Sequence, residues 1–142
     1  MSLLTVENLT LQFRTDEGLI TAVESVSFEI NSGEVLGLVG ESGSGKSVTA
    51  KSLMQLNPSN AVYSPESSIQ LELENEVVDV LSLQDSSELV VVRGGAISMI
   101  FQEPMASFAP ALTIGYQMVE QLLIHTSMSK KAAATLSVEM LE

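Results

Sequence analysis

The chain contains no cysteine and no tryptophan, and only 4% of its 142 residues are aromatic. The absence of cysteine excludes a disulfide framework, a thiolate metal site and a cysteine nucleophile, and it fits the cytoplasmic location that we expect. Basic residues are scarce, with 6 lysines and arginines against 18 aspartates and glutamates, which gives a net charge of −12. This balance argues against nucleic-acid binding, because a nucleic-acid binder needs a basic face to displace counterions.

Long hydrophobic runs are also missing. No run approaches the ~20 apolar residues that a membrane-spanning helix needs. The longest runs, at 35–39 and 96–101, have the length of buried strands, and we expect strands there. The first residues, MSLLTVEN, lack the basic and apolar regions of a secretory signal. The mean hydropathy of +0.30 is nonetheless high, which indicates a deeply buried core or apolar faces that pack on a partner.

One stretch is strongly acidic. Between Lys51 and Arg93 there is no basic residue, whereas seven acidic residues fall in that interval. We interpret the stretch as a solvated acidic face, and a docking site for a basic partner is the alternative.

Hydrophobic periodicity predicts the secondary structure. Alternating patterns at 9–13, 26–30 and 69–73 predict half-buried strands, the first two joined through a turn at 15–18. Residues 31–33 form a second predicted turn, and 57–68 and 102–110 are predicted loops.

Four helices are expected. The first spans 47–56, with Val48, Leu53 and Leu56 inward, and Asn57-Pro58 ends it. A short helix is expected at 85–93. Thr113 and Ser129 are predicted to cap the last two helices. We expect the helix after Thr113 to pack through Ile114, Met118 and Leu122. The helix after Ser129 is expected to pack through Ala133, Leu136 and Met140.

The stretch GESGSGKS, residues 40–47, matches the pattern G-x-x-x-x-G-K-[ST] of a phosphate-binding loop (P-loop). Its glycines permit backbone angles that turn successive N–H groups toward an anion. Lys46 can reach the β- and γ-phosphates, and the Ser47 hydroxyl can bind Mg²⁺. An apolar run before the loop and a helical pattern after it strengthen the match.

Two longer stretches resemble the ATP-binding-cassette (ABC) ATPases. AVESVSFEINSGEVLGLVGESGSGKSVTAKSL resembles their N-terminal third, and AISMIFQEPMASFAPALTIGYQMVEQL resembles their Q-loop region. The resemblance is closest to the ATPase subunits of importers for dipeptides, oligopeptides, nickel or microcin-like peptides, and it covers essentially the whole chain. It implies an α/β P-loop fold with an antiparallel N-terminal part and the start of a helical subdomain, as one incomplete domain over residues 1–142. Its expected parts are 1–34 (antiparallel β portion), 35–56 (P-loop strand and helix), 69–101 (strands leading to the Q-loop) and 102–142 (Q-loop and helical start).

The resemblance implies roles for individual residues. Phe13 matches the aromatic position that stacks on adenine, although strand alternation alone also explains an aromatic side chain there. Gln102 matches the Q-loop glutamine, which contacts Mg²⁺ and the attacking water, so Lys46 and Gln102 are the expected catalytic residues and Ser47 and Gln102 the expected Mg²⁺ ligands. The residues expected to bind ATP are Phe13, Gly40, Glu41, Ser42, Gly43, Ser44, Gly45, Lys46, Ser47 and Val48.

Several family motifs do not occur in the chain. We find no signature segment resembling Leu-Ser-Gly-Gly-Gln, no apolar strand ending in Asp-Glu and no switch histidine, since the only histidine, His125, is interpreted as a surface residue. By this resemblance the protein is expected to be an ATPase, but the 142-residue chain alone is expected to be nearly inactive. We also expect the strands at 35–39 and 96–101 to lack their partners, which favours marginal stability or association.

The expected function is that of the ATP-binding subunit of an importer for peptides or similar small solutes. Its expected partners are a second ABC ATPase subunit, a pair of membrane permease subunits and, indirectly, a solute-binding protein, with the chain held at the inner face of the membrane. Two alternatives remain open at this stage. One is a P-loop enzyme outside transport, and the other is a nucleotide-binding or truncated product that never turns over ATP.

Overall fold

The computed structural model describes residues 2–74, 76–103 and 107–142. Asn75, in the segment after the strand predicted at 69–73, and residues 104–106 of the Q-loop stretch lie outside the described residues. The chain divides into two compact units, Met1–Val92 and Arg93–Glu142. Within the described part of the chain, no helix combines the length and the apolar character needed to cross a bilayer.

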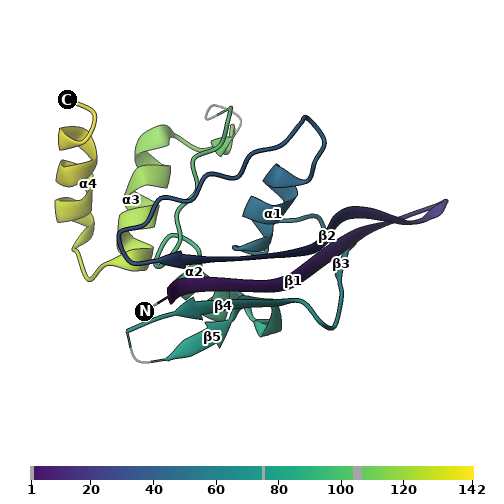
Figure 1. Ribbon diagram of the computed structural model, residues 1–142. Helices are drawn as coiled ribbons and strands as arrows, with labels where there is room; N and C mark the ends of the chain where they lie inside the picture. The colour runs from purple at the N-terminus through teal and green to yellow at the C-terminus, as the bar shows by residue number, and fades with distance from the viewer. Residues whose placement is uncertain (1, 75, 104–106) are drawn as a thin grey trace. The chain divides into compact units, whose positions relative to one another are not determined.

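The first unit is built on one antiparallel sheet. Its elements are β1 (Ser2–Thr15), β2 (Gly18–Asn31), α1 (Lys46–Ser52), β3 (Ala61–Tyr63), β4 (Ser68–Glu72), β5 (Val77–Asp79), the 3-10 helix η1 (Val80–Ser82) and α2 (Ser86–Val92). The strands follow the order β2-β1-β4-β5, and β3 also pairs with β1 (Figure 1). Strand β1 is therefore central and joins every other strand except β5.

The predicted N-terminal hairpin is confirmed. Strands β1 and β2 pair antiparallel around a two-residue turn, where the Thr15 hydroxyl donates a hydrogen bond of 2.9 Å to the carbonyl oxygen of Gly18. Gly18 has a φ of +124°, which glycine adopts without strain. Both strands extend beyond the alternating segments, to 14 residues each.

The hairpin ladder is interrupted by bulges that alternation alone does not predict. Asn8 and Ser25 both have a φ of +49°. Their backbone N–H groups leave the ladder and donate instead to hydroxyls, Asn8 to Ser27 at 2.8 Å and Ser25 to Thr10 at 2.9 Å. Side-chain acceptors thus satisfy the donors that each bulge displaces from the ladder.

The core of the first unit lies mainly under β1 and β4. Its buried apolar residues are Leu4, Val6, Leu9, Leu11, Val23, Met54, Ile69, Leu71, Val80, Leu89 and Val92. The predicted strand at 69–73 is confirmed as β4, with Ile69 and Leu71 inward. The predicted helix at 85–93 is confirmed as α2, and the Asp85 carboxylate accepts the N–H of Ser87 at 3.2 Å. This bond holds the pKa of the Asp85 carboxyl below its usual range.

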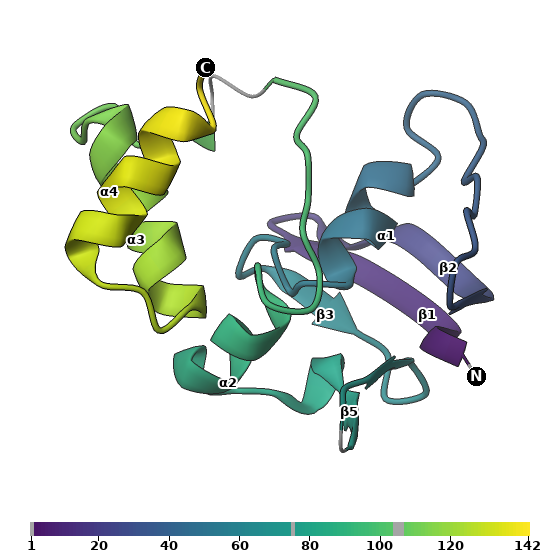
Figure 2. The same ribbon diagram turned by 90° about the vertical axis from the view of Figure 1, so that its left-hand side faces the viewer.

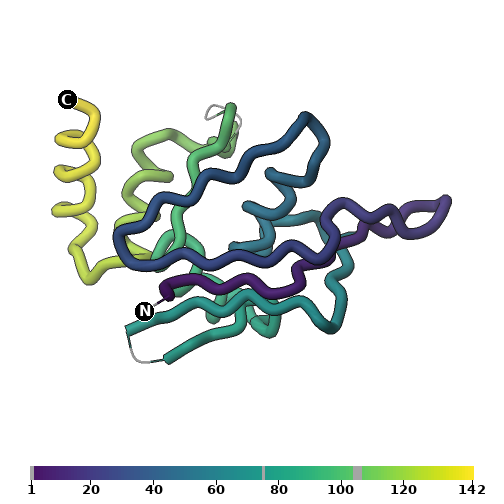
Figure 3. The backbone as a smooth tube through the Cα atoms, viewed as in Figure 1, coloured from purple at the N-terminus to yellow at the C-terminus, as the bar shows by residue number. Residues whose placement is uncertain are grey.

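Two predicted strands are wrong. Residues 35–39 follow β2 as irregular chain that runs to α1 (Figure 3), and Val35 and Val39 are 96% and 93% exposed. Residues 96–101 make only one bridge, between Ile97 and Arg93, and Ile100 is 97% exposed. An apolar run becomes a buried strand only beside strands that pair with it, and no strand among the described residues pairs with either run, apart from that bridge.

Smaller differences occur around α1. The helix ends at Ser52 instead of residue 56, and its buried residues are Thr49 and Ser52, while the three residues expected inward are only half-buried. The predicted loop at 57–68 contains β3, whose pairing with β1 orders it. Strand β5 and η1 were not predicted from the sequence.

The second unit contains two helices, α3 (Ile114–His125) and α4 (Lys130–Glu139). Both predicted caps are confirmed, since the hydroxyls of Thr113 and Ser129 accept backbone N–H groups at 3.2 and 3.3 Å. The helices lie side by side (Figure 2). Ala133 is buried as expected, but Met140 is 67% exposed and Ser137 is buried instead, and no residue of α3 is buried.

Candidate functional site

The P-loop lies in the first unit and leads directly into α1. Gly45 is the residue before the helix and has a φ of +88°, and Gly43 has a φ of +82°. Both angles lie in the left-handed region that favours glycine. The loop is otherwise held by its own backbone, with the N–H of Ser44 donating to the Glu41 carbonyl at 3.2 Å and that of Thr49 to the Gly45 carbonyl at 2.8 Å.

A bulge in β2 supplies the wall against which the loop packs. Leu11 pairs with Val23 and Gln12 pairs with Thr21, so Ala22 is an extra residue in β2. A Cβ added to Gly45 would lie 2.5 Å from the Ala22 carbonyl oxygen and 3.1 Å from Cγ2 of Val23. Only glycine therefore allows both the backbone angle of residue 45 and its approach to β2.

Lys46 folds back into the P-loop. Its Nζ donates to the carbonyl oxygens of Gly40 at 2.7 Å and Glu41 at 2.6 Å, and to the Ser44 hydroxyl at 3.2 Å. An ammonium has three donors and no acceptor, so these three bonds use its full capacity. Phosphate oxygens can replace these neutral acceptors with charged ones, which make stronger hydrogen bonds.

A cavity of about 170 Å³ lies at the start of α1. Its lining residues are Ala22, Gly43, Ser44, Gly45, Lys46, Ser47 and Val48. Lys46 is the one charged residue among them. The volume falls below the ~300–1,000 Å³ of pockets that enclose a whole small molecule. The cavity therefore suits the phosphate end of a ligand whose remainder lies outside it.

Phe13 stands on the sheet face that meets the loop. Cross-strand partners share a face, so Leu11 and Val23 lie on one face of the hairpin. Phe13 lies two residues along β1 from Leu11 and is on the same face. Val23 approaches Gly45, so this face is the one directed to the P-loop. Phe13 is half-buried and pairs with Ile20 in β2 and Ala61 in β3.

Gln102 belongs to the second unit, where it lies exposed on a bend after residues 96–101. The structure thus brings the P-loop, Ser47 and the Phe13 face together in one unit. The placement of Gln102 at a bound nucleotide stays a prediction.

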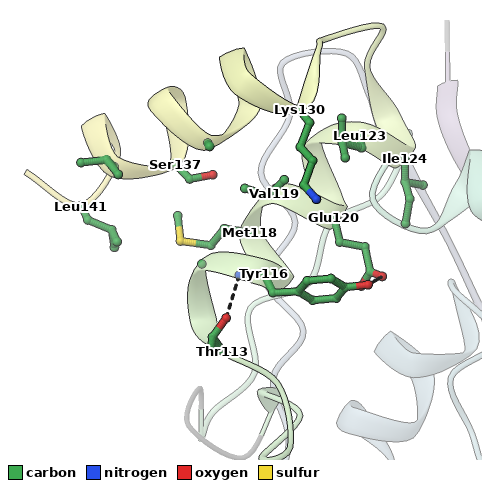
Figure 4. Close-up of a pocket in the computed structure, with 13 residues that line it drawn as sticks. Thr113, Tyr116, Met118, Val119, Glu120, Leu123, Ile124, Lys130, Ser137 and Leu141 are labelled. Carbon is green, nitrogen blue, oxygen red and sulfur yellow. Dashed lines mark hydrogen bonds between the residues drawn. The ribbon is translucent and has the colours of Figure 1, made fainter.

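The second unit has a cavity of its own between α3 and α4, with a volume of about 690 Å³ (Figure 4). Leu123, Ile124 and Leu141 line it and are 39–70% exposed. The polar groups are few, and one of them, the Tyr116 hydroxyl, lies 3.2 Å from the Glu120 carboxylate. The cavity is thus an apolar groove with a short polar rim, and Gln102 is not among its lining residues.

Sequence reasoning missed the contribution of β2 to the site. Ala22 and its bulge carry no signal in the sequence, because a bulge depends on the pairing of two strands. Sequence reasoning also missed the inward fold of Lys46, which depends on carbonyl groups that any residue type supplies.

Residues 23–141 match the ABC transporter family. Over 99% of its length the chain is 44% identical to the oligopeptide transport ATP-binding protein AppD of Bacillus subtilis, of which it covers 42%. It is 39% identical to the glutathione import ATP-binding protein GsiA of Escherichia coli, of which it covers 23%. The chain thus spans less than half the length of these relatives.

A solved structure has a similar fold. It is the dimeric, ADP- and phosphate-bound, post-hydrolysis state of the ATP-binding cassette MJ0796, with a TM-score of 0.74 and 25% identity, covering 96% of this chain and 54% of that one. This likeness confirms the expected α/β fold of an ABC ATPase, present here as part of a domain. Together with the family match and the P-loop geometry, it shows that the chain belongs to the ABC transporter family.

Proposed function

We propose that the chain is the N-terminal part of the ATP-binding subunit of an importer for peptides or similar small solutes. The observation that carries the proposal is the P-loop, in which Lys46, Ser44 and Ser47 line one cavity against the bulge of β2. The names of the relatives, which include oligopeptide, dipeptide and glutathione transport proteins, support the substrate class.

In the proposed binding mode, the phosphates of ATP enter the cavity. Their oxygens replace the carbonyl oxygens of Gly40 and Glu41 as hydrogen-bond acceptors of the Lys46 ammonium. The Ser47 hydroxyl lines the same cavity. Its oxygen suits Mg²⁺, which prefers oxygen ligands and shares its coordination with water and substrate phosphates. Mg²⁺ would neutralise phosphate charge there. The base would lie toward Phe13, outside the cavity, and Gln102 is the further residue proposed to contact Mg²⁺.

We further propose that this chain binds ATP far better than it hydrolyses it. Phosphoryl transfer requires a positioned water and charge neutralisation at several points together. Lys46 supplies positive charge, the Ser47 hydroxyl would hold Mg²⁺, and Gln102 could help to place the water. The coupling partners, a second ATPase subunit and membrane permease subunits at the cytoplasmic face, are part of the same proposal, and the dimeric state of the similar structure supports the first of them.

Phosphate release from the purified chain tests the proposed division between binding and hydrolysis. We expect release close to the rate of the Lys46→Ala variant. Turnover at about 1 s⁻¹ or faster, the lower end of ordinary enzyme rates, that Lys46→Ala abolishes would contradict the proposal. A non-transport P-loop enzyme remains the alternative function. ADP formation that an added acceptor stimulates, with the γ-phosphoryl group of ATP recovered on that acceptor, would favour it.

A further inference from the structure

Residues 57–63 link β1 to α1, and we call them the 57–63 bridge (Figure 1). At one end the bridge becomes β3, in which Ala61 pairs with Phe13. A second attachment lies next to it. The N–H of Arg14 donates to the Asn60 carbonyl at 2.9 Å, and Asn60 Nδ2 donates to the Arg14 carbonyl at 3.0 Å. The bridge is therefore fastened to β1 at Phe13 and at the residue after it.

The other end of the bridge is fastened to α1 through Asn57. Its Nδ2 lies 3.1 Å from the Val48 carbonyl oxygen and 2.9 Å from the Ser52 hydroxyl, both in α1. Within the bridge itself, the Tyr63 hydroxyl accepts from the same nitrogen at 3.1 Å. The Ser52 hydroxyl is fully buried and itself donates to the Val48 carbonyl at 2.8 Å. Two of these bonds end on the carbonyl oxygen of Val48, a residue in the first turn of α1 that lines the phosphate cavity.

We propose that the 57–63 bridge fixes the distance between Phe13 and the phosphate cavity, with Asn57 as its positioning residue. The inference rests on the proposed function. A ligand that contacts two elements binds more tightly when their spacing is set in advance, because binding then orders nothing further. ATP spans the Phe13 face and the P-loop and so depends on the bridge. Inorganic tripolyphosphate reaches only the loop and does not.

A purely structural role makes a different prediction. If the bridge only stabilised the fold, its loss would reduce the fraction of folded protein and would weaken both ligands by the same factor. The ratio of ATP affinity to tripolyphosphate affinity therefore separates positioning from stability.

The test is calorimetric titration of the chain with Mg-ATP and with Mg-tripolyphosphate. Asn57→Ala removes both hydrogen bonds of the bridge to α1, and Tyr63→Phe removes the hydroxyl that holds the Asn57 side chain within the bridge. We expect the affinity for ATP to fall about three- to tenfold in each, the loss that corresponds to one or two partly buried hydrogen bonds. The affinity for tripolyphosphate should stay within about twofold. Phe13→Ala should show the same selective loss of ATP affinity.

Ser67→Ala is the matched control. The Ser67 hydroxyl also has three polar contacts. It accepts the N–H of Thr10 at 2.9 Å, and its single O–H faces the carbonyl oxygens of Asn8 at 3.1 Å and Thr10 at 3.3 Å. These bonds tie a connecting segment to β1 without reaching α1. Ser67→Ala should therefore leave the ratio of the two affinities unchanged.

Equal losses for both ligands, or no loss in Tyr63→Phe, would overturn the inference. Tyr63→Phe keeps the ring and removes one hydroxyl, so it decides the question if Asn57→Ala fails to fold, which thermal melting of each variant reveals. If the unaltered chain binds neither ligand, both the proposed function and this inference are wrong. If it binds both and the variants match it, only the inference fails.

Discussion

A Cβ added to Gly45 would lie 2.5 Å from the carbonyl oxygen of Ala22. The contact joins the P-loop to the bulge in β2, so the backbone of one strand sets the depth at which the loop sits. Backbone oxygen cannot move aside as a flexible side chain can, which makes this contact a strict requirement for glycine at position 45.

Gly45→Ala is expected to destabilise the first unit by about 1–3 kcal/mol from the φ of +88° alone, with a further penalty from the clash with Ala22. Mg-ATP binding should be lost as the loop shifts away from β2. Denaturant unfolding and calorimetric titration of the same variant measure the two effects.

Gly43→Ala is the matched control for the clash. Gly43 has a similar φ of +82°, but a Cβ there meets no atom within 4 Å. Gly43→Ala should therefore lower the free energy of unfolding only by the backbone strain at residue 43. If Gly45→Ala proved no more destabilising than Gly43→Ala, the close contact with Ala22 would have no energetic role.

The turn after β2 is expected to depend on pH through Glu34. The backbone N–H of Asn31, at 2.8 Å, and then its side-chain amide, at 3.1 Å, donate to the Glu34 carboxylate and lower its pKa. Because the folded-state pKa lies below the unfolded one, the stabilisation is fully present above the ordinary glutamate range. It is lost as pH falls through the lower pKa of the folded state.

The measurement is the chemical shift of the Asn31 amide proton during an acid titration. We expect it to follow the Glu34 carboxyl, with a midpoint below the ordinary glutamate value. Glu34→Gln should abolish this titration, whereas Glu29→Gln, on β2, should preserve it. A midpoint at or above the ordinary value would show that the two hydrogen bonds do not form in solution.

The apolar segment at 35–39 is expected to drive self-association. Val35 and Val39 are almost fully exposed, at 96% and 93%, and exposed apolar chain favours contact with other molecules. Val35→Asp with Val39→Asp should shift the chain toward monomer with a change in stability within about 0.5 kcal/mol, as for other exposed positions. Sedimentation velocity over a range of concentrations measures the shift. The control is Val138→Asp, which alters another exposed valine, 58% exposed on α4. If association were unchanged in the double variant, residues 35–39 would not form the contact between molecules.

The sequence predicted those parts of the fold that depend on local chemistry. The hairpin, β4, α2 and the caps at Thr113 and Ser129 follow from alternation, turn residues and hydroxyl acceptors a few residues away. The P-loop residues were predicted for the same reason, since their pattern is contiguous.

Features that depend on distant partners were not predicted. The runs at 35–39 and 96–101 have strand composition, but strand formation requires a neighbouring strand to supply hydrogen bonds. The bulge at Ala22 depends on how β2 pairs with β1, and Asn57 bonds to Val48 in α1 and to Tyr63 in β3, so these features join different elements of the fold. No local pattern encodes these contacts, although they shape the walls of the site.

The central claim is that Lys46 and the loop around it hold the phosphates of ATP. Calorimetric titration with Mg-ATP tests it most directly in three proteins: the unaltered chain, Lys46→Ala and Lys51→Ala. Lys51 is the other lysine of α1 and lies outside the phosphate cavity. We predict saturable binding that weakens at least about tenfold in Lys46→Ala, as expected for losing a charge-assisted hydrogen bond, and stays unchanged in Lys51→Ala. Absence of binding in the unaltered chain, or equal binding in all three proteins, would contradict the claim.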